Sequence, residues 1–138
     1  MSFNDFLGIE LLETNEHFAK ARILLKDEYK NNINSLHGGM TATIADTISG
    51  YLASNRKYMT PTNNMSLYYL RPIMFEEGDY CYAEARIIKR GKKIVVINTE
   101  IYDNDYNLCA YSTFSFSVVE RPKEYDYQSY VVFKNEEK

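Results

Sequence analysis

The segment from Gly38 to Ala53 has the longest helical pattern in the chain. Its apolar and small residues return at spacings of three and four, so nearly every face of a helix here is apolar or small. We predict a buried helix over these residues, the only long helix that the sequence indicates. Such a helix needs other elements packed around it.

Strand patterns lie on both sides of this helix. Residues 17–26 alternate two sets of side chains, as in a half-buried strand. Residues 3–12 are densely apolar and predict a short helix or turn that leads into this first strand. After Pro61, four aromatic and β-branched segments separated by turn residues predict further strands: 64–70, 79–89, 93–102 and 108–119.

This order of elements favours an α+β domain, in which an antiparallel sheet wraps one central helix. The 138 residues suffice for one core, and we expect the domain to cover residues 1–120. Residues 121–138 are a C-terminal extension of unclear role, either an appended strand or an arm that binds a partner.

Charge and composition exclude several classes of function. A net charge of -3 and a pI near 5.4 give no attraction to nucleic acid or to anionic lipid. No apolar run is long enough for a membrane span, and the N-terminus lacks a signal-peptide pattern, so we expect a cytoplasmic protein. Cys81 and Cys109 lie in apolar runs without CxxC spacing. They predict buried structural cysteines rather than a metal site, with a disulfide as the alternative.

The start of the predicted helix is the first candidate for chemistry. Gly38 and Gly39 open it, and a helix N-terminus leaves unpaired N–H groups with partial positive charge, which can hold an oxyanion. Glycine lets a substrate carbonyl approach closely. The alternative is that the two glycines only form a tight turn.

Asp46 is the second candidate. Its neighbours at helical spacing are small residues suited to close packing, not to a charged solvated face. Because burial of an unpaired carboxylate is costly, Asp46 must either meet solvent in a cleft or take part in chemistry. The alternative is a carboxylate on a solvated stripe of the helix.

The spacing of Gly38 and Asp46 has a geometric consequence. Eight residues at about 1.5 Å rise per residue separate them by roughly 12 Å along the helix. One small carbonyl group cannot contact both in a single chain. If both act on one carbonyl group, two helices must lie antiparallel in a twofold dimer with two identical sites.

Three motifs carry a resemblance to a known family: Leu36-His37-Gly38-Gly39, Ala45-Asp46 and Tyr69-Leu70-Arg71-Pro72. Over roughly residues 5–120 the chain resembles the phenylacetate-pathway and human thioesterase superfamily member branch of the hotdog thioesterases. The resemblance implies a hotdog fold, assembled as a homodimer or homotetramer. It also implies hydrolysis of small-to-medium or aromatic acyl-CoA, with coenzyme A as part of the substrate and no cofactor.

The resemblance also implies roles for individual residues. Gly38 would supply the oxyanion N–H, and His37 and Asn31 of the same subunit would shape the site. Asp46 of the other subunit would act as general base or nucleophile, and Thr62 falls where the family often has a hydroxyl that helps to hold the water. Two alternatives stay open: His37 only caps the helix, and Asn31, Asn32 or Asn34 only forms the turn.

A basic turn between two predicted strands is similar to the family's turn near the coenzyme A phosphates. It comprises Lys89, Arg90, Gly91, Lys92 and Lys93, and its cations suit a phosphate or pyrophosphate. With Gly39, its last four residues complete the predicted substrate contacts. A charged hairpin tip that keeps the sheet edge soluble explains the same residues.

The main competing function is a non-catalytic module that binds or senses acyl-CoA on the same fold. Retention of both Gly38 and Asp46 argues against it. A hotdog dehydratase is a third reading, but neither His17 nor His37 has the His-Phe-Pro-like context of those enzymes.

Overall fold

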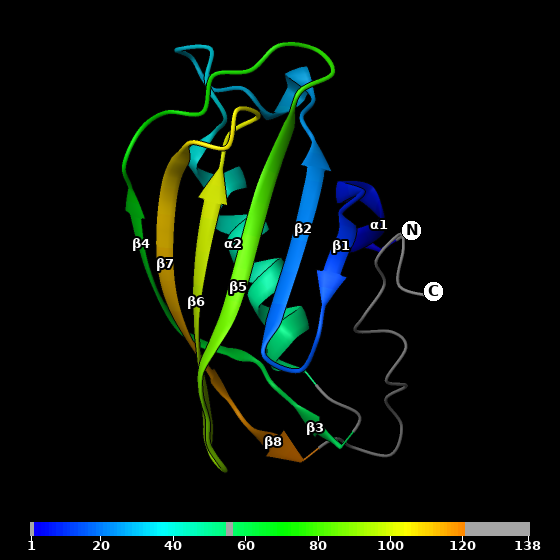
Figure 1. Cartoon of the computed structure of the whole chain (residues 1–138), viewed down its shortest axis with the longest axis vertical. Coiled ribbons are helices and arrows are strands. Elements are labelled where there is room, and N and C mark those ends of the chain that lie inside the picture. The colour runs from blue at the N-terminus through cyan, green and yellow to red at the C-terminus, as the bar shows by residue number, and fades with distance from the viewer. Residues whose placement is uncertain (1, 55–56, 121–138) are drawn as a thin grey trace.

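The computed structural model describes residues 2–54 and 57–120, in which one long helix packs on a face of an antiparallel sheet (Figure 1). The six strands of the sheet are ordered β1-β2-β5-β6-β7-β4. The predicted α+β architecture is therefore confirmed. The elements are α1 (Phe3–Leu7), β1 (Glu10–Thr14), β2 (Phe18–Leu24), a 3-10 turn (Asp27–Tyr29), α2 (Gly38–Ala53), β3 (Tyr58–Met59), β4 (Thr62–Tyr69), β5 (Tyr80–Arg90), β6 (Ile94–Tyr102), β7 (Leu108–Ser117) and β8 (Val119–Glu120).

The long helix begins and ends at the predicted residues, and the five predicted strands correspond to β2, β4, β5, β6 and β7. Two features differ from the prediction. Residues 10–14 form the separate edge strand β1, which pairs antiparallel with β2, and β3 pairs with β8 in a small second sheet. The C-terminal extension, 121–138, lies outside the described residues.

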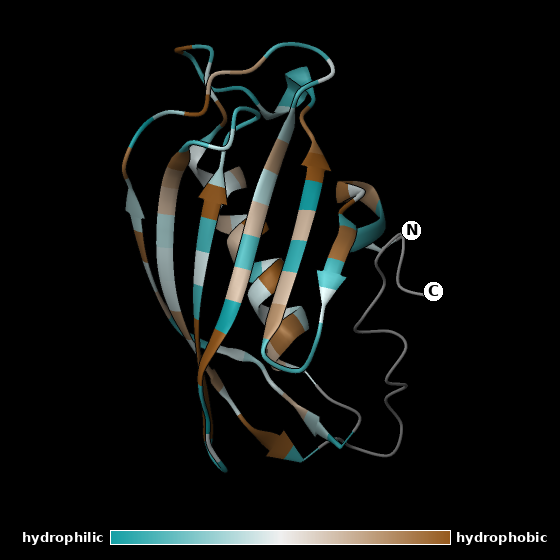
Figure 2. Ribbon diagram, in the orientation of Figure 1, coloured by the Kyte–Doolittle hydropathy of each residue, from teal (hydrophilic) through white to brown (hydrophobic). Residues whose placement is uncertain are grey.

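The core lies between α2 and the sheet. Apolar and polar residues alternate along β2 and β5 (Figure 2), and their buried positions include Ala21, Ile23 and Cys81. Phe114 and Phe116 of β7 stack at 5.7 Å between ring centroids and are almost fully buried. The buried side chains that alternate along the strands and those on one side of α2 therefore form one continuous core.

Within one chain the sheet packs against one side of α2. Ile44, Ala45 and Ile48 are buried on the sheet side, whereas Asp46 and Thr47 on the other side are half-buried. A helix with small residues on its second side leaves room there for a cavity.

A hydroxyl pair fastens the buried side of α2 to the sheet. Ser49 Oγ and Thr99 Oγ1 of β6 lie 2.5 Å apart, and the Ser112 hydroxyl donates to the Thr99 carbonyl at 3.2 Å. All three residues are buried. Each hydroxyl has its partner inside the core, as buried polar groups require.

Both cysteines are buried free thiols, which confirms the prediction of structural cysteines. Burial raises the pKa of Cys109 to about 11, and burial also raises the pKa of Cys81. These thiols are therefore poor nucleophiles near neutral pH. None of the helices in the described ranges has the length and apolar character that a membrane span requires.

Candidate active site

Asp46 projects from the open side of α2 toward the first residue of β4. Its Oδ1 accepts a hydrogen bond of 2.7 Å from the Thr62 hydroxyl. Both side chains line a cavity of about 640 Å³ between α1, α2, β3 and β4. The structure thus brings together the predicted carboxylate and the predicted hydroxyl, which are 16 positions apart in the sequence.

The other hydroxyls on this side of α2 are committed elsewhere. Thr43 Oγ1 donates to the Gly39 carbonyl at 2.8 Å, and Thr47 Oγ1 donates to the Thr43 carbonyl at 2.7 Å. Such bonds to the preceding helical turn are typical of threonine inside helices. Within the described ranges, Thr62 is the only side chain that donates to Asp46, and no ion pair involves this carboxylate.

The N-terminus of α2 has one open N–H group. His37 is the N-cap residue, and its Nδ1 accepts from the Gly39 N–H at 2.9 Å. The Met40 and Thr41 N–H groups donate to the His37 carbonyl at 2.8 and 3.2 Å. Of the first four N–H groups of α2, only that of Gly38 meets no acceptor among residues 2–54 and 57–120. Gly38 therefore keeps the donor that an oxyanion would need.

Tyr69, at the end of β4, packs on the same helix terminus. Its hydroxyl donates to the Gly38 carbonyl at 2.7 Å, and a Cβ at Gly38 would lie 3.4 Å from that oxygen. Partial burial raises the pKa of Tyr69, which keeps its hydroxyl a donor. Tyr69 belongs to one of the motifs that resemble the family, but no local pattern predicts a role for it. Only the pairing of β4 with β7 places it beside α2.

His37 and Asn31 have structural roles here. His37 caps α2, and a Cβ at Gly39 would lie only 3.0 Å from its Nδ1, so this cap requires glycine. Asn31 Oδ1 accepts from the Ile33 and Ser35 N–H groups, and its Nδ2 donates to Ser35 Oγ at 2.9 Å. Both alternatives left open by the sequence, a cap and a turn residue, are observed, and a further role in the reaction stays a prediction.

Gly38 and Asp46 open into different cavities. Gly38, Asn31, Ile33 and Tyr69 line a second cavity of about 370 Å³, to which Asp46 does not contribute. The first cavity likewise does not include Gly38. The two groups are therefore not brought together within one chain, as the helix rise of about 1.5 Å per residue predicts.

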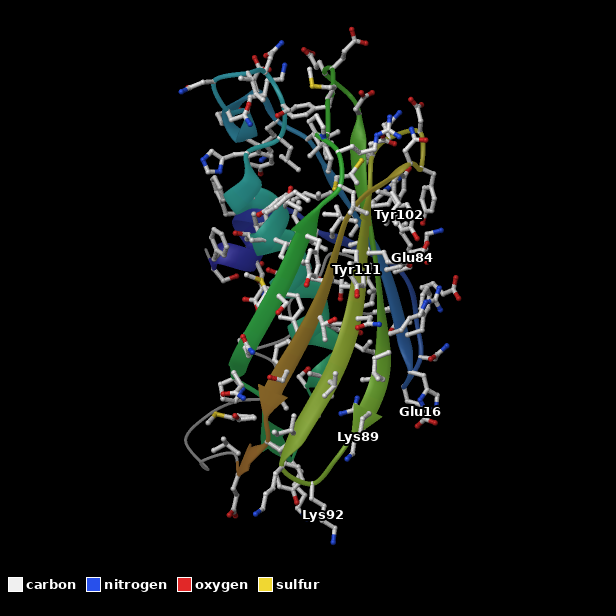
Figure 3. The ribbon with its side chains drawn as sticks, turned by 90° about the vertical axis from the view of Figure 1, so that its left-hand side faces the viewer. Glu16, Glu84, Lys89, Lys92, Tyr102 and Tyr111 are labelled. Carbon is white, nitrogen blue, oxygen red and sulfur yellow. The ribbon has the colours of Figure 1, made fainter. Side chains whose placement is uncertain are left out.

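The basic turn joins β5 to β6 at the far end of this hairpin, where Figure 3 shows Lys92 at the tip. Arg90 is committed to the fold, because its Nη1 and Nη2 donate to the Ala53 and Leu52 carbonyls, both at 3.0 Å. This contact gives Arg90 a structural role, and its predicted contact with a phosphate stays a prediction. Lys92 and Lys93 are exposed and make no ion pair with the described residues.

Gly91 also has a structural role in this turn. Its N–H donates to the Ile94 carbonyl, and a Cβ there would lie 2.9 Å from that oxygen. A side chain at this position would force the backbone apart. The turn therefore needs glycine whether or not it contacts a substrate.

Comparison with known proteins gives one family and a consistent set of relatives. Residues 33–110, more than half of the chain, match the family model described as "Thioesterase superfamily". Escherichia coli acyl-coenzyme A thioesterase PaaI is 27% identical over 104 residues, covering 75% of this chain and 73% of the relative. Human acyl-coenzyme A thioesterase 13 is 29% identical over 79 residues, covering 56% and 55% of the two chains.

Solved structures extend the similarity to the fold. The E. coli PaaI structure superimposes with a TM-score of 0.77 at 24% identity, covering 83% of this chain and 82% of that one. A Streptococcus mutans protein solved with bound acetyl CoA gives a TM-score of 0.75 at 21% identity, with coverage of 83% and 91%. The predicted hotdog fold and the predicted resemblance to the phenylacetate-pathway branch are both confirmed.

Proposed function

The chain belongs to the thioesterase superfamily and is a thioester hydrolase, and from this premise we propose that it converts small-to-medium or aromatic acyl-CoA to free acid and coenzyme A. Two observations on relatives support the choice of acyl-CoA. The E. coli and human relatives are named as acyl-coenzyme A thioesterases, and the S. mutans structure contains acetyl CoA.

The hydrogen bond between Asp46 and Thr62 inside a cavity carries this proposal. In the general-base route, Asp46 takes a proton from water while the water oxygen attacks the thioester carbonyl carbon. The carbonyl oxygen becomes an oxyanion that accepts from the Gly38 N–H. Collapse of this intermediate breaks the carbon–sulfur bond, and the thiolate of coenzyme A receives the proton.

In the nucleophilic route, Asp46 itself attacks the carbonyl carbon, and the carbon–sulfur bond breaks to release coenzyme A as its thiolate. Water then hydrolyses the resulting anhydride to the free acid and restores the Asp46 carboxylate, and the thiolate takes up a proton that this hydrolysis releases. Thr62 acts as a positioning residue in both routes, because its hydroxyl fixes one carboxylate oxygen. The second oxygen, Oδ2, accepts from no side chain in the described ranges, so it is the atom that we assign to water or substrate.

We assign the oxyanion donor to the partner subunit, since Gly38 and Asp46 of one chain line separate cavities. β4 is an edge strand on which only Leu67 is half-buried, and Met65, Tyr68 and Tyr69 are exposed. Pairing of two such faces would cover this surface and place Gly38 of one subunit near Asp46 of the other. The proposed assembly is a homodimer, or a dimer of such dimers.

The remaining predicted residues support this site in different ways. The His37 cap occupies the Gly39 N–H and so leaves Gly38 as the terminal donor. Lys92 and Lys93 are the cations that we assign to the nucleotide phosphates, at the exposed hairpin tip. Arg90 lies in the same turn, and its bonds to α2 give it a structural role beside any contact with the phosphates.

Asp46→Asn tests the proposal most directly. Loss of the base or nucleophile should lower kcat by about 100-fold to 10,000-fold with acyl-CoA binding retained. Kinetics with direct detection of the released thiol, beside calorimetric binding, measure both properties. Asp105→Asn, an exposed loop substitution, is the matched control and should have no effect.

A loss of tenfold or less in Asp46→Asn would remove Asp46 from the mechanism. A wild-type protein that binds acyl-CoA but hydrolyses none of a panel of chain lengths would instead support the non-catalytic module.

A further inference from the structure

The short helix α1 forms one wall of the cavity that contains Asp46. Phe3 and Asn4 line this cavity, although they precede Asp46 by more than forty positions in the sequence. A capping box stabilises the start of the helix. The Asp5 N–H donates to Ser2 Oγ, and the Ser2 N–H donates to Asp5 Oδ2, both at 3.1 Å.

The other end of α1 is anchored in the core. Leu7 and Ile9 are 1% and 2% exposed, and Gly8 between them ends the helix with φ 68°. Glycine adopts this left-handed conformation without strain. The chain therefore fixes α1 at both ends and holds Phe3 at the cavity.

The cavity has a polar part and an apolar part. Asp46, Thr62 and Thr43 supply the polar groups, whereas Met59, Phe116 and Phe3 supply apolar surface. Along α2 the lining continues beyond Asp46 to Tyr51. At about 1.5 Å rise per residue, these five residues add about 7.5 Å. When the thioester carbonyl of a substrate lies at Asp46, its acyl chain can thus extend along the apolar surface of Met59, Phe116 and Phe3.

Phe3 and Phe6 form a natural comparison. They are the same residue type on one helix and are similarly exposed, at 59% and 53%. Phe3 lines the cavity, whereas the ring of Phe6 lies beneath Lys26 Nζ at 5.5 Å and makes no part of that lining. A large exposed apolar side chain gains stabilisation when a ligand covers it, and only Phe3 has this opportunity at the cavity.

We infer that Phe3 is a specificity-determining residue that favours acyl groups longer than acetyl by covering their hydrocarbon. The inference rests on the proposed acyl-CoA substrate and adds which residue selects among acyl groups. An acetyl group is too short to leave the neighbourhood of the carboxylate. A medium-length chain reaches the apolar part of the cavity and contacts the Phe3 ring.

Binding of S-octyl-CoA, a thioether that cannot be hydrolysed, tests this inference without turnover. Phe3 contacts only one side of the octyl group. Phe3→Ala should therefore weaken S-octyl-CoA binding by about fivefold to tenfold, near the low end of the affinity losses typical of apolar pockets. Binding of coenzyme A alone should not change. Phe6→Ala should leave both dissociation constants at the wild-type values, and Phe3→Leu should retain most of the affinity.

Kinetics supply the second measurement. The ratio of kcat/KM for octanoyl-CoA to that for acetyl-CoA should fall by a similar factor in Phe3→Ala and stay constant in Phe6→Ala. The inference is overturned if Phe3→Ala preserves both the S-octyl-CoA affinity and this ratio, or if Phe6→Ala changes them equally. A wild-type protein that binds S-octyl-CoA with this Phe3 dependence but cleaves no thioester would contradict the proposed hydrolysis alone.

Discussion

The two ends of α2 differ in how many of their backbone groups have hydrogen-bond partners. At the C-terminal end, the last four carbonyls all have partners. Ser54 donates its N–H to Gly50 and Tyr51 and its hydroxyl to Tyr51, and Arg90 donates to Leu52 and Ala53. At the N-terminal end, the Gly38 N–H has no acceptor among the described residues, while the next three N–H groups are satisfied within the cap.

This difference separates stability from chemistry along one helix. A cation at the C-terminus complements the helix dipole and fills the last acceptors, which stabilises the fold. An open donor at the N-terminus contributes nothing to stability, yet it complements a negative charge that develops during a reaction. Substitutions at the two ends should therefore affect different measurements.

Gly38→Val should have the largest effect. Crowding of the open N–H should lower kcat by about 100-fold to 1,000-fold, the loss typical for one oxyanion donor. Steady-state kinetics on the folded variant measure it. Gly38→Ala is the graded control, because its Cβ would make only ordinary contact with Tyr69 at 3.4 Å. Near-normal turnover by a folded Gly38→Val variant would show that the open end has no part in the reaction.

Mixed dimers should show whether the Gly38 N–H of one subunit acts together with Asp46 of the same subunit or of the partner. Asp46→Asn and Gly38→Val chains, unfolded and refolded together, should form mixed dimers in which one site carries both lesions and the other is intact. Random pairing makes about half of the dimers mixed, so activity should return to about a quarter of wild type from two inactive parents. Verified mixed dimers without activity would place a complete site within each chain.

Arg90→Met should affect stability and not turnover. It keeps the apolar stem but removes the donors to Leu52 and Ala53. Because Arg90 is partly exposed, we expect a loss of about 1 kcal/mol in the free energy of unfolding, with kcat unchanged. Urea denaturation measures the first quantity. Arg86→Met, which removes a partly exposed ion pair with Glu84 and the stacking of Arg86 on the Phe18 ring, should also leave kcat unchanged. A fall in kcat without a loss of stability would contradict the division between the two ends.

Neutralising Lys92 and Lys93 together should have the smallest effect. The double glutamine variant should raise KM for acyl-CoA by about threefold at low salt, with less effect as ionic strength rises, because exposed charges are screened. A truncated thioester that lacks the nucleotide should show no change. An equal change for both substrates would exclude phosphate recognition by this turn.

The local pattern of apolar and polar residues was enough to predict most helices and strands, but not β1, β3 and β8. The bounds of α2 follow from its apolar spacing, and β2 follows from strict alternation. β1 was missed because Leu11 and Leu12 continue the helical spacing of residues 3–12, and most of this edge strand is exposed. β3 and β8 have two residues each, too few to produce a period.

The residues of the site also differ in whether local sequence predicts their roles or whether those roles depend on contacts distant in the sequence. Asp46 was predicted because a carboxylate among small helical residues is locally unusual. The position of Thr62 came only from the family resemblance, since it depends on how the chain between α2 and β4 returns. Tyr69 and Arg90 reach α2 across 31 and 37 positions. No local pattern encodes such contacts, so their roles became evident only in the folded chain.

The buried pair of Ser49 and Thr99 has a consequence for the direction in which Asp46 points. Apolar and small residues occupy most faces of α2, so their packing alone selects weakly among small rotations of the helix about its axis. A rotation that moves Ser49 away leaves the buried Thr99 hydroxyl without this partner, at a cost of about 1 to 3 kcal/mol. A polar contact inside the core thus selects one angular setting of the helix, and this setting aims the carboxylate at the cavity.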